Sequence, residues 1–267
     1  CIGAAVHDGD LLLGFGIQDN CAFIMRTPPS VVNELIQEAI DAYTTDYTVD
    51  ENVYDVEGTK YKVYKTDLIS DEIRHGNLWE PFLHDVFEQY ITKDSVVLEG
   101  GCHIGTHSLK LAQLADKVIC FEPLKTSADL LRENLKLNGL TNVEIKEEGL
   151  SDTGSTASFA YVNKDNIGGA VLESGSDIAL TTIDSLNLEK LDFIKLDIEG
   201  YEKKALLGGL ETIKKFHPVI AVECWDDYPN ATIEHAKEEF NFLLELGYEL
   251  EQIEHHDFLL VFKGDDK

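Results

Sequence analysis

The chain has 267 residues, and its 22 Lys and Arg against 50 Asp and Glu give a formal net charge of −28 at pH 7. This length suits one main domain with an appendage. Because nucleic acids and anionic membranes bind clustered basic side chains, the charge argues against both as partners. No apolar run approaches the roughly 18 residues of a membrane helix, and we see no signal-peptide pattern.

The five cysteines are widely spaced and form no CxxC pair. Neither a zinc site nor a disulfide framework is therefore expected, and reduced thiols indicate an intracellular, cytoplasmic protein. Because the chain starts with Cys1 instead of Met, we expect a processed chain or a fragment of a longer protein.

Residues 1–74 are predicted to form an N-terminal extension of short elements. Glycines and prolines divide residues 1–30 into turns and short strands. Ser30 is a candidate N-cap for a helix whose apolar residues recur at helical spacing. Residues 52–66 alternate around a turn at Glu57 and Gly58, which predicts a β-hairpin.

Residues 75–267 are predicted to form the main domain, in which strands and helices alternate after a first helix at 81–89. The predicted strands cover 96–98, 118–121, 143–145, 193–197 and 219–223, and the predicted helices cover 106–115, 126–138, 201–213 and 231–246. This alternation is typical of a parallel sheet with right-handed crossovers. Two consecutive strands, 248–253 and 258–262, are expected to pair antiparallel at the sheet edge. The sequence therefore predicts a doubly wound, Rossmann-like α/β fold.

Residues 155–186 interrupt the alternation with a polar segment rich in Gly and Ser, which contains one hairpin-like piece at 158–162. The segment follows the C-terminal end of a strand, where α/β proteins place substrate loops. We therefore expect it near the ligand site.

A glycine-rich turn follows the first strand of the main domain. Glycine allows a sharp turn and close approach of a ligand, and the next helix begins with unpaired N–H groups. Glu122 ends the next strand 122 − 101 = 21 residues after Gly101, the spacing at which a carboxylate accepts hydrogen bonds from both ribose hydroxyls. The pattern predicts a cofactor that contains a nucleoside.

Two features favour S-adenosylmethionine (SAM) over NAD as that cofactor. His103 stands where a G-x-G-x-x-G fingerprint starting at Gly101 needs its second glycine. Glu99, near the strand end, would repel a pyrophosphate but suits the cationic amino group of SAM.

Carboxylates also gather at the predicted ends of two later strands. Asp197 and Glu199 lie two residues apart at one strand end, and Glu223 ends the next strand. Methyl transfer needs an aligned acceptor whose proton is removed, so all three are candidate catalytic groups. Asp197 and Glu223 are also candidate Mg²⁺ ligands. His75 is a further candidate base because it precedes the segment Trp79–Glu80.

Residues 96–141 and 192–223 resemble the FkbM-type SAM-dependent methyltransferases, which methylate hydroxyls of sugars and natural products. The matching segments are Val97–Ser108, Phe121–Pro123, Asn134–Asn138 and, most specifically, Phe193–Glu202. The resemblance extends over about residues 50–262 and implies a class I methyltransferase fold and O-methylation of a sugar or glycan hydroxyl. The cofactor-binding residues that it implies are Glu99, Gly101, His103, Gly105, Thr106, Glu122 and Asp197, with the backbone at Leu150 and Ser151 beside the adenine.

The sequence departs from this family's usual pattern at two positions, because the family has Asp at the position of Glu99 and Asn at the position of His103. Two other interpretations stay open. One is a non-catalytic methyltransferase-like module of a larger glycan-synthesis protein, and the other is an NAD-dependent oxidoreductase on a similar sheet.

Overall fold

The computed structural model describes residues 3–7, 10–17, 21–27, 48–163, 166–224 and 232–264. The chain divides into two compact units, Cys1–Asp46 and Tyr47–Lys267. The first unit contains an antiparallel sheet in the order β1-β2-β3, formed by β1 (Gly3–His7), β2 (Asp10–Ile17) and β3 (Cys21–Thr27). The helix predicted after Ser30 lies outside the described residues.

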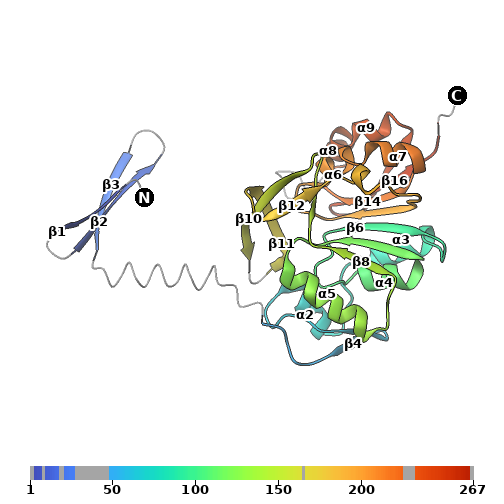
Figure 1. Ribbon diagram of the computed structural model, residues 1–267, viewed down its shortest axis with the longest axis horizontal. Helices are drawn as coiled ribbons and strands as arrows, with labels where there is room; N and C mark the ends of the chain where they lie inside the picture. Colours follow the sequence, from blue (N-terminus) through green and yellow to red (C-terminus); the bar gives the residue numbers. More distant parts are fainter. Residues whose placement is uncertain are drawn as a thin grey trace. The chain divides into compact units, whose positions relative to one another are not determined.

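A seven-stranded sheet forms the centre of the second unit (Figure 1). Its order is β15-β16-β14-β13-β6-β7-β8, and the strands from β14 to β8 run parallel. The last two strands pair antiparallel at one edge, as predicted. The strands are β6 (Val96–Gly100), β7 (Lys117–Phe121), β8 (Val143–Lys146), β13 (Phe193–Leu196), β14 (Val219–Glu223), β15 (Tyr248–Glu254) and β16 (Asp257–Phe262).

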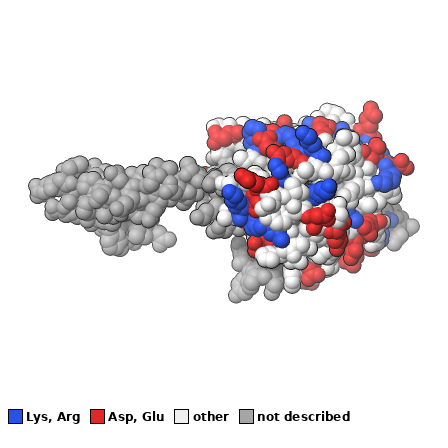
Figure 2. Space-filling model, turned by 90° about the horizontal axis from the view of Figure 1, so that it is seen from below, with Lys and Arg blue, Asp and Glu red and all other residues white. Residues whose placement is uncertain are grey.

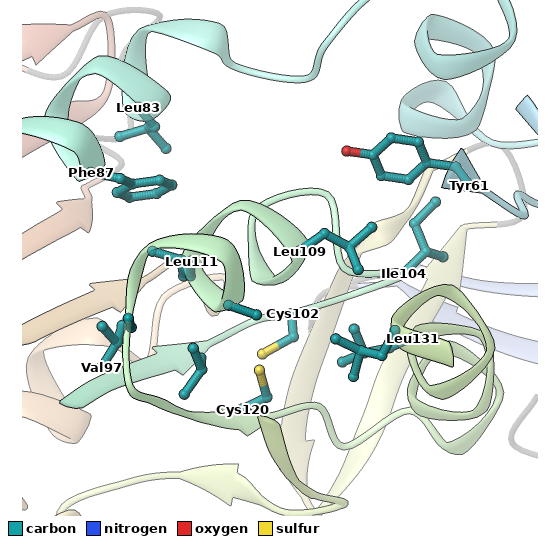
Figure 3. Close-up of a cluster of buried hydrophobic side chains, with 14 of the residues drawn as sticks. Tyr61, Leu83, Phe87, Val97, Cys102, Ile104, Leu109, Leu111, Cys120 and Leu131 are labelled. Atoms are coloured by element: carbon teal, nitrogen blue, oxygen red, sulfur yellow. The ribbon is translucent and has the colours of Figure 1, made fainter. Parts of the chain in front are cut away.

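Helices cover both faces of this sheet and give the second unit two hydrophobic cores (Figure 1). Successive side chains of β6 point to opposite faces of the sheet, so they belong to different cores. Val97 packs with α2 to α5, and Leu98 packs with α6 to α9. Figure 3 shows part of the first core. The helices are α2 (Leu68–Arg74), α3 (Pro81–Tyr90), α4 (Ser108–Leu114), α5 (Lys125–Leu137), α6 (Glu202–Leu207), α7 (Leu210–Phe216), α8 (Ile233–Glu239) and α9 (Asn241–Leu244).

The predicted hairpin, β4 (Tyr54–Val56) with β5 (Thr59–Tyr61), belongs to the second unit. Tyr61 is buried in the first core, and the Lys62 N–H donates to the side chain of Asn134 in α5 at 2.6 Å. The boundary expected between residues 74 and 75 therefore differs from the division in the structure, which follows Asp46. Contacts between segments far apart in the sequence cause the difference.

Two helices that were predicted as continuous are each divided in two. The first breaks at Gly208 and Gly209, where α6 passes close to other parts of the backbone: a Cβ on Gly208 would lie 2.1 Å from the carbonyl oxygen of Ser151. The second consists of α8 and α9, which meet at Phe240.

The polar segment predicted as an insert forms most of a second sheet, in the order β11-β10-β12-β9. Its strands are β9 (Gly149–Leu150), β10 (Ser155–Asn163), β11 (Asn166–Ser174) and β12 (Ile178–Thr181). The hairpin-like piece is part of β10, which pairs antiparallel with β11. A short 3₁₀ turn, Asp184–Leu186, leads back to the main sheet.

Acidic and basic side chains lie next to one another on the face shown in Figure 2. Some basic groups form ion pairs, such as Arg132 with Asp129 at 2.8 Å and with Glu147 at 2.7 Å. Among the described residues, no helix is long and apolar enough to cross a membrane.

Candidate active site

Two adjoining cavities lie at the C-terminal ends of the parallel strands β6, β7 and β13. The space open to the centre of a water molecule is about 50 Å³ in the first and about 450 Å³ in the second. Residues that follow these strands, together with one residue of β11, line both cavities, so ligands in the two cavities would lie side by side. The shared lining residues are Gly101, His103, Glu122, Gly168, Asp197 and Glu199.

Glycine is required at two positions of the turn after β6. Gly101 has a φ of +79°, and a Cβ there would lie 1.7 Å from the carbonyl oxygen of Asp197. Gly105 has a φ of +93°, and its Cβ would lie 2.4 Å from Leu131 Cδ1 in α5. The first glycine therefore lets the turn approach β13 beside the cavities, whereas the second allows α5 to pack closely and lines neither cavity.

Glu122 lies at the end of β7, as predicted, and lines both cavities. Its Oε2 accepts the His103 N–H at 2.7 Å and its Oε1 accepts the Leu124 N–H at 2.8 Å. Burial raises the pKa of Glu122 to about 7, although the two N–H groups act in the opposite direction. The carboxylate is thus held in one orientation, with lone pairs left for ribose hydroxyls.

Glu99 lies inside the protein and not in the predicted position beside a cofactor. Its side chain is fully buried and lines neither cavity. One carboxylate oxygen accepts the hydroxyl of Ser108 at 2.5 Å and the thiol of Cys120 at 3.4 Å. Figure 3 shows the sulfur atoms of Cys102 and Cys120 directed toward each other within the first core. This arrangement therefore does not support contact between the Glu99 carboxylate and the cofactor.

Asp197 forms an ion pair that was not predicted, in which the lysine is buried and the aspartate is partly exposed. The Lys195 ammonium lies 3.1 Å from Asp197 Oδ2. Burial would lower the pKa of Lys195, but Asp197, Glu99 and Glu80 raise it, so the amine stays charged. Burial would raise the pKa of Asp197, but Lys195 and a hydrogen bond with Glu223 lower it. Asp197 is therefore an ionised carboxylate where the two cavities meet.

Glu199 lies in the turn between β13 and α6, with a φ of +53°. Glu202 holds this turn in place, because its Oε1 accepts the N–H groups of Ile198 at 2.8 Å and Gly200 at 3.2 Å. Burial and the nearby Asp197 and Glu202 raise the pKa of Glu199 to about 7. A carboxyl group with such a pKa can take up and release a proton near neutral pH.

His103 is 7% exposed and has a φ of +47°. Neither ring nitrogen has a hydrogen-bond partner among the described residues. Burial lowers the pKa of His103, against the charges of Asp67 and Asp197, so the ring is neutral. Its backbone N–H positions Glu122, and its ring lies 5.8 Å from the ring of Tyr64.

Most of the other predicted residues line one of the cavities, but Ser151 does not. Leu150 lines the first cavity, and Thr106 and Glu223 line the second. Ser151 lines neither, and its N–H donates to the carbonyl of Thr181 at 2.9 Å.

His75 also lies outside both cavities and is not a catalytic candidate in this structure. Its side chain is 68% exposed at the end of α2, and Nδ1 lies 2.8 Å from the carbonyl oxygen of Asp71. Although His75 precedes Trp79 and Glu80 closely in the sequence, only Trp79 and Glu80 line the second cavity.

Sequence reasoning assigned no role to His107, Lys195 or Asp257, all of which line the second cavity. His107 Nε2 lies 3.0 Å from Glu80 Oε2. Asp257 lies opposite Glu223 in the pairing of β14 with β16. The predicted pairing of the last strands could have brought Asp257 to the site if its register had been known.

Comparisons with known proteins identify a family and several similar sequences. The sequence profile of the methyltransferase FkbM domain matches residues 100–257. The 2-O-methyltransferase NoeI of Sinorhizobium fredii is 26% identical in an alignment 148 residues long, which covers 46% of this chain and 60% of NoeI. Methyltransferase sdnD of Sordaria araneosa is 22% identical in an alignment 215 residues long, which covers 64% of this chain and 81% of sdnD. The match therefore spans less than two thirds of NoeI.

Solved structures with similar folds include methyltransferase FkbM from Methylobacillus flagellatus, with a TM-score of 0.45 and 20% identity over 64% of this chain and 44% of that chain. SMU.1697c from Streptococcus mutans, solved in complex with SAH, has a TM-score of 0.41 and 16% identity over 67% of this chain and 93% of that chain. Because the family profile covers more than half of the sequence, this protein belongs to the methyltransferase FkbM domain family.

Proposed function

We propose that this protein transfers a methyl group from SAM to a hydroxyl group of a sugar or glycan. The main support is the pair of adjoining cavities, because a group-transfer enzyme must hold donor and acceptor side by side. Family membership supports methyl transfer, and the relative NoeI, a 2-O-methyltransferase, supports an oxygen acceptor.

The first cavity suits the nucleoside part of the donor. Apolar side chains line it, among them Phe121, Leu150 and Phe159, and offer surfaces for an adenine ring. Glu122 is fixed by two backbone N–H groups and presents its carboxylate to the ribose hydroxyls. When bound, SAM supplies an electrophilic methyl group on a sulfonium.

The second cavity would hold the acceptor, with Asp197 and Glu199 beside the donor cavity. As the acceptor oxygen bonds to the methyl carbon and the bond from carbon to sulfur breaks, the hydroxyl proton must leave. Asp197 is ionised and can orient the hydroxyl, and Glu199 has a pKa of about 7 and can accept the proton. Glu223 acts on this step through its hydrogen bond with Asp197.

Magnesium does not fit the residues proposed for it. Asp197 already binds the Lys195 ammonium, which supplies a positive charge where a metal would. Within the described residues, the cluster suited to holding a metal consists of Glu99, Cys102 and Cys120, and its two sulfur ligands do not suit Mg²⁺. No step of the reaction is therefore derived through a metal.

Calorimetric titration with S-adenosylhomocysteine (SAH), with NAD as a control, tests the proposal. We expect micromolar SAH binding and no response to NAD. A response to NAD alone would favour the oxidoreductase alternative, and absence of SAH binding would overturn the proposed function. SAH binding without methylation of any hydroxylated sugar would leave the non-catalytic module.

A further inference from the structure

Lys195 carries hydrogen-bond donors that the described residues around it do not use. An ammonium group has three N–H donors. The described part of the chain supplies one hydrogen-bond acceptor to this ammonium, the Oδ2 atom of Asp197 at 3.1 Å. The side chain of Lys195 is 4% exposed, so the remaining donors are largely withdrawn from water. A buried charged group with unused donors costs free energy until an acceptor is bound to it.

The position of Lys195 shows which ligand could supply that acceptor. Lys195 belongs to β13, the central strand of the main sheet, and lines the second cavity. Its partner Asp197 lines both cavities, so it lies where they meet. A methyl group that passes from donor to acceptor must cross this junction. The ammonium of Lys195 therefore lies on the acceptor side of the transfer.

A lysine that only balanced buried charge would be expected to contact Glu99. The two residues are partners in the register of β6 and β13, and the Glu99 side chain is fully buried. However, Glu99 Oε1 has no hydrogen-bond partner among the described residues. Lys195 instead binds Asp197, whose side chain is 31% exposed and can be hydrated. The ammonium thus contacts the carboxylate at the cavity in preference to the buried one.

Methyl transfer to a hydroxyl needs a hydrogen-bond donor as well as a base. The hydroxyl oxygen has two lone pairs, so one can attack the methyl carbon while the other accepts a hydrogen bond. Negative charge develops on this oxygen as its proton leaves, and a charged donor withdrawn from water stabilises that charge. Ionised carboxylates such as Asp197 cannot supply this bond, because they only accept hydrogen bonds.

We propose that Lys195 is a catalytic residue whose ammonium donates a hydrogen bond to the reacting oxygen of the acceptor. That oxygen forms a bond with the methyl carbon, the bond from carbon to sulfur breaks with its electron pair going to sulfur, and the hydroxyl proton passes to Glu199. Lys195 keeps its proton throughout. This inference rests on the proposed function, and it adds the group that stabilises the reacting oxygen.

Removal of the ammonium tests this role. Lys195→Ala deletes the side chain beyond Cβ, and Lys195→Met keeps an unbranched stem without the charge. Transfer of tritium-labelled methyl groups from SAM is measured with the methyl glycosides of glucose, galactose, mannose and N-acetylglucosamine. Both variants should lose about 100- to 1000-fold in kcat, as expected when one donor to a developing oxyanion is removed. Calorimetry should show that SAH binding persists.

The rates are compared at the high-pH plateau of each pH profile. Burial and nearby carboxylates raise the pKa of Glu199, and Lys195 opposes them. Without the ammonium, Glu199 loses its proton at a higher pH, so the rise of the rate with pH should move upward in both variants. Comparison at the plateau removes this indirect effect and leaves the loss of the donor.

Rescue by an added cation separates hydrogen bonding from charge. n-Propylammonium matches the atoms that Lys195→Ala deletes, so it should restore part of the lost rate in a saturable way. Tetramethylammonium carries the same charge without an N–H donor and should restore none. As a control, Lys214→Ala removes a lysine from an exposed ion pair with Glu211 and should keep the wild-type rate. Thermal unfolding establishes that the variants are folded.

Each result decides a different point. Wild-type plateau rates in both variants would overturn the inference and leave the proposed function standing. Equal rescue by the two cations would also overturn it, because charge alone would then be sufficient. If Lys195→Ala does not fold, the plateau rate of Lys195→Met decides. A wild-type protein that methylates none of the glycosides would count against the proposed function itself, and the inference would fall with it.

Discussion

Replacing Gly101 with alanine tests how closely the glycine-rich turn approaches β13. The new Cβ would lie 1.7 Å from the carbonyl oxygen of Asp197, at a φ of +79°. The left-handed conformation costs about 1–2 kcal/mol, and relief of the overlap adds about 1–3 kcal/mol. We therefore expect Gly101→Ala to lower the free energy of unfolding by about 2–5 kcal/mol.

Gly139→Ala is the matched control. Gly139 also has a positive φ, +66°, but no atom lies within 4 Å of the position of its Cβ. This variant should lose only the conformational part, about 1–2 kcal/mol. Denaturant unfolding followed by tryptophan fluorescence measures both losses, and SAH titration measures binding.

The difference between the two variants isolates the contact of the turn with β13. The Gly101 variant should also bind SAH much more weakly, because its turn must move away from Asp197, which lines both cavities. Equal stability losses in the two variants, with SAH affinity unchanged in both, would refute the close approach.

Three other predictions concern single side chains. Glu122→Gln should weaken SAH binding by about 10- to 100-fold, since it removes a charged acceptor of hydrogen bonds, whereas Glu147→Gln, at an exposed ion pair, should not. In the folded protein the pKa of Glu122 is about 7, compared with an ordinary value of 4.5, so Glu122 keeps its proton to a higher pH than in the unfolded chain. The free energy of unfolding without ligand should therefore fall as the pH rises from about 4.5 to about 7, by about 3 kcal/mol from this group, and Glu122→Gln should flatten that fall in pH-dependent denaturation. His75→Ala should leave SAH affinity within about twofold by calorimetry, because the ring is exposed and lies outside both cavities.

The parts of the fold that the sequence predicts correctly depend on local patterns. Buried strands alternate with amphipathic helices, and the glycine-rich turn comes directly after a strand, so the parallel sheet and the position of Glu122 follow from spacing. The antiparallel pair at the edge follows from two strands joined by a short turn at His255 and His256. Each of these features involves neighbours in the sequence.

Glu99 shows where reasoning from the end of a strand fails. The strand β6 continues to Gly100, so Glu99 is an interior residue of the strand and shares a face with Val97. Its partner in the parallel register is Lys195 of β13. A buried lysine at that register position compensates the charge of Glu99, and this pairing cannot be read from either strand alone.

The sequence predicts that residues 155–186 lie near the ligand site, but it does not predict that β11 is a strand there, because glycine usually marks turns. Gly168 and Gly169 instead lie in a strand, where a Cβ on Gly168 would come within 2.9 Å of Ile69 Cδ1 and one on Gly169 within 2.7 Å of Asn166 Nδ2. Because glycine has no side chain, this strand can lie close to His103 and α2. The strand β11 lines both cavities, whereas α3 and the last two strands line only the second, and only the tertiary fold brings these segments to the ends of β6 and β7. Residues of the second cavity that come from distant parts of the chain, such as Trp79 and Asp257, therefore cannot be found by arguments from sequence spacing.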